Sequence, residues 1–192
     1  MAISTPLPPY QQRNLRLALE AVNHRLVRDA HPKVTNNSLD TAARCAIPGR
    51  FEMIESEGVT VLLDAAHNPQ KIGALTEALH SFTKKPILYV VAFGENKLST
   101  VSESLALLQG ASADRNIIAT EFDVAGTNHG ALSAERLKHM AEQAGFSSVV
   151  AYVNPHEALN YSLEWARQSG GLIVVTGSFY LISMLRPRLL SR

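Results

Sequence analysis

The stretch VLLDAAHNP (residues 61–69) runs from aliphatic residues to a carboxylate, Asp64, and then to His67 and the pair Asn68-Pro69. The aliphatic part is typical of a buried strand. Asn-Pro is typical of a helix start, with asparagine at the N-cap and proline in the first turn. A strand that leads directly into a helix is a building block of parallel sheets. The stretch therefore predicts an α/β fold.

The same alternation continues on both sides of this stretch. Further short strands are expected in RFEMIE (50–55), PILYVVAF (86–93), RNIIATEF (115–122), SSVVAYV (147–153) and GLIVVTG (171–177). The first of these alternates imperfectly, as a strand near a sheet edge does. Helices are expected over residues 69–82, 100–109, 133–144 and 155–168, with Asn154-Pro155 as a second Asn-Pro start and Thr100 with Glu103 as a capping box. Strands without polar alternation, separated by helices, predict a three-layer domain around a mostly parallel six-stranded sheet.

Residues 1–46 follow a different pattern. Residues 10–29 carry Leu15, Leu19, Val22 and Leu26 at helical spacing, which predicts an amphipathic helix that needs a partner surface. A short second helix is expected to open at Ser38. We therefore place a boundary between a helical segment, 1–46, and the α/β domain, 47–192.

Composition limits the class of protein. The chain has 192 residues, 46% hydrophobic and 18% charged, with a net charge of +1, which is ordinary for a globular protein with a core. The near-zero charge gives no general attraction to nucleic acid or acidic membranes. Cys45 is the only cysteine, so no intrachain disulfide forms, and a reducing cytoplasm is the expected location.

In an open parallel sheet, ligands bind beyond the carboxyl ends of the strands, which places Asp64 and His67 at the expected site. One interpretation is local: Asp64 and Asn68 compete to cap the next helix, and His67 fills the turn. The other is functional. A carboxylate that ends a buried strand needs a partner, and a helix N-terminus attracts anions, so Asp64 is suited to ribose hydroxyls and His67 to phosphate or carboxylate.

Other motifs are weaker. The sequence contains neither G-x-G-x-x-G nor the P-loop pattern G-x-x-x-x-G-K-[ST]. Lys97, after the third strand, is a candidate anion contact, although an exposed loop lysine is more often only solvated. Ser178 offers a hydroxyl at the start of the last helix, without an evident base, and His129 fits a surface loop. No set of residues has metal-ligand spacing, so no metal site is expected.

Taken in order, IPGRFE (47–52), LLDAAHNP (62–69) and VTGSFYLIS (175–183) resemble the carboxy-terminal domain of folylpolyglutamate synthases, of the Mur ligase superfamily. YQQRNLRLALEA (10–21) is similar to the helix that closes the central ATPase domain of that family. The resemblance implies a Rossmann-like sheet with one antiparallel strand. It also identifies residues 1–46 as the end of the central domain plus a linker.

The implied activity is that of an ATP-dependent ligase. ATP with Mg phosphorylates the γ-carboxylate of a folate, and L-glutamate attacks the acyl phosphate. The resemblance assigns Asn14, Arg50, Asp64 and His67 to ATP, and Ser178 and His67 to glutamate, with His67 the one candidate catalytic residue. The P-loop, the folate site and most Mg ligands belong to the missing domains, on which this chain is expected to pack. The chain alone is therefore expected to be inactive.

The chain departs from the family pattern at two places, and two alternatives stay open. GENKLST (94–100) keeps Gly94 and Lys97 but lacks the family's Asp-Lys-Asp, which leaves the role of Lys97 open. Tyr10 stands where histidine is common. The first alternative is a peptidoglycan-precursor Mur ligase domain, and the second is a stand-alone, non-catalytic nucleotide-binding module.

Overall fold

The computed structural model describes residues 7–45, 47–82, 85–111, 114, 116–123 and 130–191. The chain separates into two compact units, Met1–Ile47 and Pro48–Arg192. The first unit contains α1 (Pro9–Arg28) and α2 (Asn36–Arg44), and no residue of α1 is buried. The expected start of the second helix at Ser38 is wrong by two residues, because the hydroxyl of Thr35 accepts a hydrogen bond from Ser38 N (3.2 Å) and caps the helix at Asn36.

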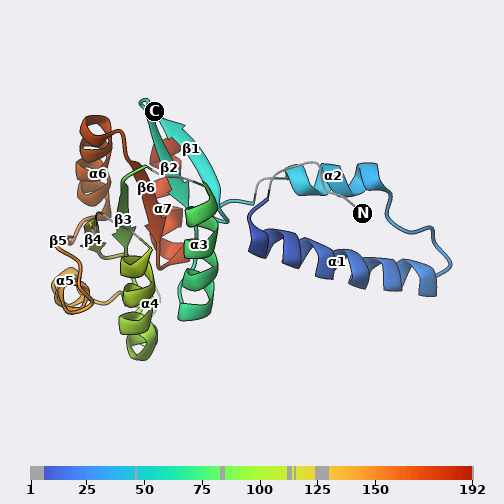
Figure 1. Ribbon diagram of the computed structural model, residues 1–192, viewed down its shortest axis with the longest axis horizontal. Helices are drawn as coiled ribbons and strands as arrows, with labels where there is room; N and C mark the ends of the chain where they lie inside the picture. Colours follow the sequence, from blue (N-terminus) through green and yellow to red (C-terminus); the bar gives the residue numbers. More distant parts are fainter. Residues whose placement is uncertain are drawn as a thin grey trace. The chain divides into compact units, whose positions relative to one another are not determined.

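The second unit is built on a six-stranded sheet (Figure 1). Its strands are β1 (Glu52–Ser56), β2 (Val59–Leu63), β3 (Ile87–Val91), β4 (Asn116–Thr120), β5 (Ser148–Tyr152) and β6 (Leu172–Thr176), in the order β1-β2-β6-β3-β4-β5. β1 pairs with β2 in an antiparallel hairpin at one edge, and all other pairs are parallel. This arrangement confirms the predicted mostly parallel sheet with one antiparallel strand.

Helices cover both faces of this sheet. α3 (Pro69–Phe82), α4 (Leu98–Gly110) and α5 (Ala134–Gln143) pack their apolar residues on one face. α6 (Pro155–Ser169) and α7 (Phe179–Leu190) pack on the other. The central strands β3 and β6 are buried along their whole length, which explains why their sequences show no polar alternation.

Helix caps determine where the loops end. Asn68 Oδ1 accepts from Lys71 N (3.0 Å) and Asn154 Oδ1 accepts from His156 N (2.8 Å), so both predicted Asn-Pro starts are confirmed. The predicted capping box at Thr100 is wrong. A 3-10 turn, η1 (Glu95–Lys97), leads directly into α4 at Leu98, and the Thr100 hydroxyl donates to Lys97 O (3.0 Å) from within the first turn.

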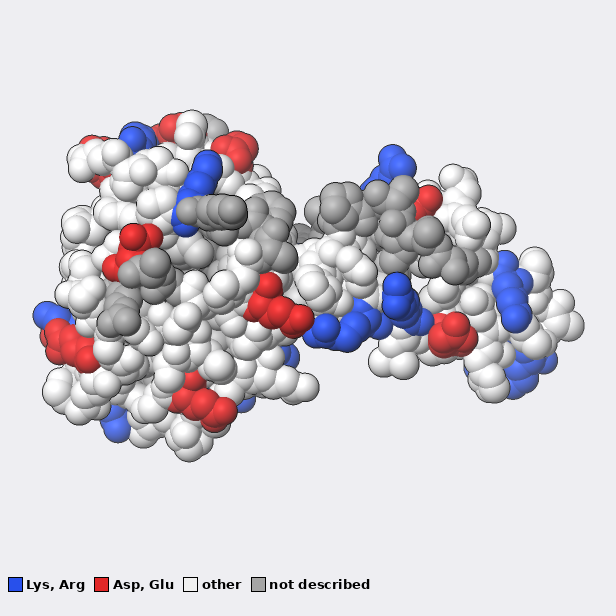
Figure 2. Space-filling model, viewed as in Figure 1, with Lys and Arg blue, Asp and Glu red and all other residues white. Residues whose placement is uncertain are grey.

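Charged side chains are interspersed over the displayed face of the second unit, without a large area of one sign (Figure 2). This distribution agrees with the net charge of +1. None of the described helices combines the length and the apolarity that a bilayer-spanning helix requires.

The close approach of Gly177, at the end of β6, to the backbone of Ala92 can be tested by substitution. Gly177 has φ +93°, and a Cβ built there would lie 2.5 Å from Ala92 O, whereas Gly58 has φ +77° with open space around it. Both Gly→Ala substitutions introduce left-handed backbone strain of about 1–2 kcal/mol, but only Gly177→Ala adds a clash with backbone. We expect Gly177→Ala to lower the free energy of unfolding by about 1–3 kcal/mol more than Gly58→Ala.

The measurement is urea unfolding followed by the fluorescence of Trp165, the only tryptophan, which lies in the second unit. Equal losses of stability for the two variants would show that the approach of Gly177 to Ala92 does not constrain this strand end.

Candidate functional site

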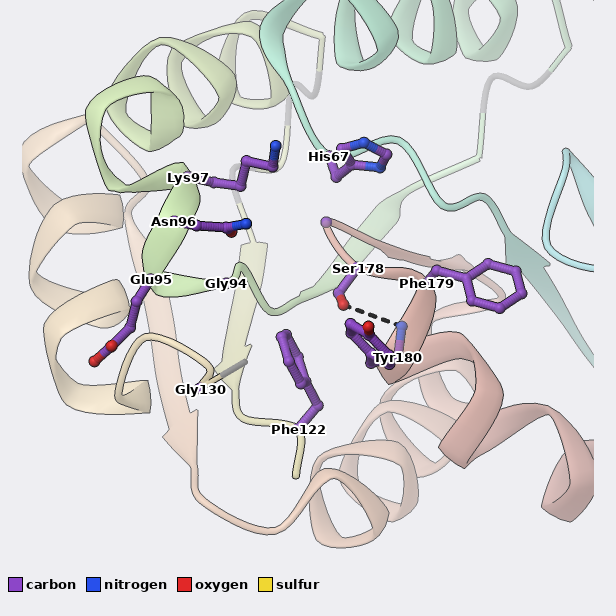
Figure 3. A pocket seen from close by; sticks show the side chains of 11 residues that line it. His67, Gly94, Glu95, Asn96, Lys97, Phe122, Gly130, Ser178, Phe179 and Tyr180 are labelled. Carbon is purple, nitrogen blue, oxygen red and sulfur yellow. Dashed lines mark hydrogen bonds between the residues drawn. The ribbon is translucent and has the colours of Figure 1, made fainter. Parts of the chain in front are cut away.

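A pocket of about 230 Å³ lies where the strands end. It is lined by residues that follow four strands: His67 after β2; Gly94, Glu95, Asn96 and Lys97 after β3; Phe122 and Gly130 after β4; and Gly177, Ser178, Phe179 and Tyr180 after β6 (Figure 3). The structure therefore brings together three residues that the sequence singled out, His67, Lys97 and Ser178. The pocket lies at the carboxyl edge of the sheet, as expected for a parallel α/β domain.

His67 is held in one orientation from both sides. Its Nδ1 lies 2.8 Å from the Ala65 carbonyl oxygen, and its Nε2 lies 3.2 Å from the Lys71 ammonium nitrogen. A carbonyl only accepts and an ammonium only donates, so these contacts assign the proton to Nδ1 and leave Nε2 as an acceptor.

The electrostatic surroundings keep His67 neutral. Burial is the largest effect and lowers the pKa of His67; the hydrogen bond to Ala65 raises it, and the positive charges of Lys71, Lys97 and Arg50 lower it further. The net result is a pKa below the ordinary value. At neutral pH the ring is therefore an uncharged group with an acceptor nitrogen facing cations.

The motif predicts Asp64 at the binding site, but in the structure Asp64 does not line the pocket. It is 5% exposed, and it is not among the residues that line the pocket. Its two carboxylate oxygens accept hydrogen bonds from Phe51 N (2.8 Å) and Ala66 N (2.9 Å). Asp64 therefore does not compete with Asn68 for the cap of α3 but ties residues 49–51 to the end of β2. Its assignment to a ribose stays a prediction.

Arg50 lies on the turn that Asp64 holds. Its side chain is exposed, and Nη1 donates to Gly49 O at 3.4 Å. The turn is fixed at its other end by Glu52, which accepts from Gly49 N (2.8 Å) and forms a two-pronged ion pair with Arg186 of α7. Although burial raises the pKa of Glu52, the hydrogen bonds from Arg186 and Gly49 hold it below its ordinary value.

Ser178 serves first as a helix cap. Its hydroxyl oxygen accepts from Tyr180 N at 3.1 Å, the bond drawn in Figure 3, and the residue is 5% exposed. The predicted place of Ser178 at the start of the last helix is confirmed. Beside it, the rings of Tyr180 and Phe122 lie 5.4 Å apart at 34° and form an apolar wall of the pocket.

Sequence reasoning missed Lys71, Phe122 and Tyr180. A signal for Lys71 was present, because it follows His67 by four residues, the spacing at which side chains of a helical segment meet. Phe122 lies in the loop after β4 and Tyr180 in the first turn of α7, both in segments expected to follow strand ends, but a single aromatic residue there has no distinguishing pattern.

Three other sequence predictions concern Asn14, His129 and metal binding. Asn14 lies on α1 of the first unit, where its side chain is exposed. His129 lies outside the described residues. Among the described residues, no group of three or more His, Cys, Asp or Glu side chains is placed to hold a metal ion, so no metal-dependent step is assigned to them.

Comparisons with known proteins agree with this architecture. The dihydrofolate synthase/folylpolyglutamate synthase of Escherichia coli (strain K12) is 27% identical over 180 residues, which make up 93% of this chain and 38% of that protein. This chain therefore spans about two fifths of the length of that relative.

Two solved structures share the fold. The Mycobacterium tuberculosis folylpolyglutamate synthase complexed with ADP and AMPPCP superposes with a TM-score of 0.67 at 25% identity, over 81% of this chain and 35% of that one. The E. coli FolC structure in complex with DHPP and ADP gives a TM-score of 0.77 at 24% identity, over 99% of this chain and 41% of that one.

The family comparison covers the part of the chain that forms the pocket. Residues 49–179 match the family described as "Mur ligase, glutamate ligase domain". The match begins at the turn that carries Arg50, includes the β2–α3 loop with His67, and ends just after Ser178. The chain therefore belongs to the Mur ligase family, and its second unit is the glutamate ligase domain.

Proposed function

We propose that this chain is the carboxy-terminal part of an ATP-dependent ligase that adds L-glutamate to the γ-carboxylate of a folate. The observation that carries the proposal is the pocket at the carboxyl edge of the sheet, which joins His67, Lys97 and Ser178 within a domain of the glutamate ligase family. The resemblance to folylpolyglutamate synthases extends over 93% of the chain, including the first unit, and supports folate as the acceptor.

The nucleotide is proposed to bind beside His67 and Arg50. A cavity of about 230 Å³ is below the roughly 300–1,000 Å³ of a typical complete ligand pocket, so it suits one part of a nucleotide. In this proposal residues 1–46 are the end of a central ATPase domain, where Asn14 contacts the nucleotide, and the P-loop and the magnesium ligands belong to that domain. Asp64 accepts hydrogen bonds from Phe51 N and Ala66 N, and a ribose hydroxyl is proposed as a further donor to this carboxylate.

The chemistry proposed for the site is transfer through an acyl phosphate. The folate carboxylate attacks the terminal phosphate of ATP, and ADP leaves. The amine of glutamate then attacks the carbonyl carbon, phosphate leaves, and the proton of the amine passes to a base. The unprotonated Nε2 of His67 makes it the candidate for that base, and Ser178 is proposed to contact the glutamate. Enclosing the acyl phosphate between two lobes excludes water, which would otherwise hydrolyse it.

An activity assay tests the assignment as a whole. We expect the 192-residue chain alone to release no ADP, because it has no P-loop, and the intact protein to release ADP only with a folate and L-glutamate together. A UDP-sugar peptide in place of the folate is the discriminating control. Turnover of the peptide would identify a peptidoglycan-precursor ligase instead, and folate-dependent turnover by the chain alone would contradict the two-lobe arrangement.

A separate prediction concerns Arg50. In the intact protein, Arg50→Ala removes a positive charge from the proposed nucleotide site, and we expect kcat/KM for ATP to fall about tenfold, mainly through KM. Arg136→Ala, which removes an exposed arginine from α5, is the matched control and should leave both constants unchanged. Equal ATP kinetics in the two variants would remove Arg50 from the site.

A further inference from the structure

An ion pair joins the start of β1 to α7. Arg186 of α7 donates from Nε to both carboxylate oxygens of Glu52 (3.0 Å each) and from Nη2 to Oε1 (2.8 Å). The Glu52 side chain is 9% exposed and that of Arg186 is 31% exposed. Two-pronged contacts between a guanidinium group and a carboxylate fix the orientation of the two groups as well as their distance. Neither residue lines the pocket.

Glu52 also holds the turn that precedes β1. Its Oε2 accepts a hydrogen bond from Gly49 N at 2.8 Å, and Gly49 O accepts one from Ala65 N at 2.9 Å. The backbone of Gly49 lies against α7, because a Cβ built there would be 3.2 Å from Ile182 Cγ2 and 3.9 Å from Phe179 Cε2. The turn is therefore tied to α7 in two ways, by packing on Gly49 and by the carboxylate of Glu52.

One face of α7 makes all of these contacts. Phe179, Ile182 and Arg186 lie at positions i, i+3 and i+7, a spacing that places side chains on one side of a helix. Ser178, which caps the same helix and lines the pocket, comes directly before this face. A helix rises about 1.5 Å per residue, so Arg186 lies roughly 12 Å along the axis from Ser178. The helix thus links the Ser178 hydroxyl to the turn that carries Arg50.

Stability alone does not account for the ion pair, because α7 has other anchors. Leu181, Leu185 and Leu189 are at most 1% exposed and hold the helix on the sheet. A partly buried ion pair contributes little net stability, since the cost of removing both charges from water offsets their attraction. The main consequence of the pair is a defined geometry between the turn and the helix.

We propose that Arg186, acting through Glu52, is a positioning residue that keeps the turn carrying Arg50 in register with Ser178 during the ligase reaction. The inference rests on the proposed function, in which Arg50 contacts the nucleotide and Ser178 the glutamate, and it deepens that function. ATP activates the folate carboxylate and glutamate consumes the product, so the two reactants must be aligned, and a displacement of about 1 Å is enough to slow such a reaction. Arg186 itself lies beyond residues 49–179, which the family match covers.

Loss of this register has a specific chemical consequence. When the amine of glutamate is misplaced, the acyl phosphate persists, and water attacks it instead of the amine. The attack returns the folate carboxylate and releases inorganic phosphate, so ADP has been formed without an amide bond. The amount of ADP released per amide bond formed therefore reports alignment, and it does not depend on how much of the protein is folded.

The first measurement uses the intact protein. Arg186→Met removes the charge and the donors but keeps an unbranched side chain, and we expect the ratio of ADP released to amide bonds formed to rise about twofold or more. Arg186→Lys, which keeps the charge, should bring the ratio back toward the parent value. Arg167→Met is the matched control, because Arg167 of α6 pairs with Glu57, just after the other end of β1. Its loss should leave the ratio unchanged.

The second measurement does not depend on ligase activity. In the 192-residue chain, hydrogen exchange of the Gly49 amide, followed by NMR, reports its hydrogen bond to Glu52. We expect Arg186→Met to speed this exchange roughly three- to tenfold and Arg167→Met to leave it unchanged. Glu52→Gln, which removes the negative charge that Arg186 contacts, is a second variant with the same expected effects on the exchange and on the ADP ratio.

The outcomes separate the positioning role from the proposed function. A raised ADP ratio together with faster Gly49 exchange supports the proposal. An ADP ratio in Arg186→Met equal to that of Arg167→Met, or equal Gly49 exchange in these two variants, overturns it. Failure of both Arg186→Met and Glu52→Gln to fold assigns the ion pair to stability alone and also overturns it. A parent protein that releases no ADP with folate and L-glutamate refutes the proposed function, and Gly49 exchange still decides whether Arg186 holds the turn.

Discussion

The buried carboxylate of Asp64 is the constraint on which the site depends. It joins the end of β2 to the turn at residues 49–51, and Ala65 N donates to Gly49 O at 2.9 Å beside it. That turn contains Gly49 at φ +67° and Phe51 at φ +51°, the second of which is unfavourable for a residue with a side chain. Hydrogen bonds to a charged acceptor are stronger than neutral ones, so Asp64 stabilises a turn that would otherwise relax. Through it, Arg50 and His67 are held on neighbouring segments.

Strand order determines where the pocket opens. β6 returns from the far side of the sheet to lie between β2 and β3. The chain after β3 leads to α4 on one face, while the chain after β6 leads to α7 on the other. Adjacent parallel strands whose helices leave toward opposite faces create a crevice between their ends, which is the position where open α/β sheets bind ligands. Ser178 and Lys97 come from the two sides of this crevice, and Gly177 allows β6 to turn there against the backbone of Ala92.

The fold could be predicted from the sequence because its signals are local. Aliphatic runs and Asn-Pro starts gave the bounds of α3 correctly and those of α6 to within one residue. Where two local signals competed, the prediction was less accurate: a 3-10 turn before Thr100 moved the start of α4 to Leu98, and Thr35 took the cap expected at Ser38. The partners of Asp64 could not be predicted, because Phe51 lies 13 residues away and reaches it only through the β1–β2 hairpin. The contact of Lys71 with His67 needed the orientation of the ring, which the Ala65 carbonyl sets.

The first turn of α3 shows how the charge of one residue affects the protonation of another. Substituting an acidic residue for Lys71 would suit the first turn of α3 and would reduce repulsion with Lys97 and Arg50. The same change would give His67 a negative neighbour and raise its pKa, which would favour the protonated ring. A cation at this position favours the neutral ring, at a modest cost in helix stability. The electrostatic conflict at the start of α3 is therefore linked to the neutral state of His67, in which Nε2 accepts a hydrogen bond from Lys71.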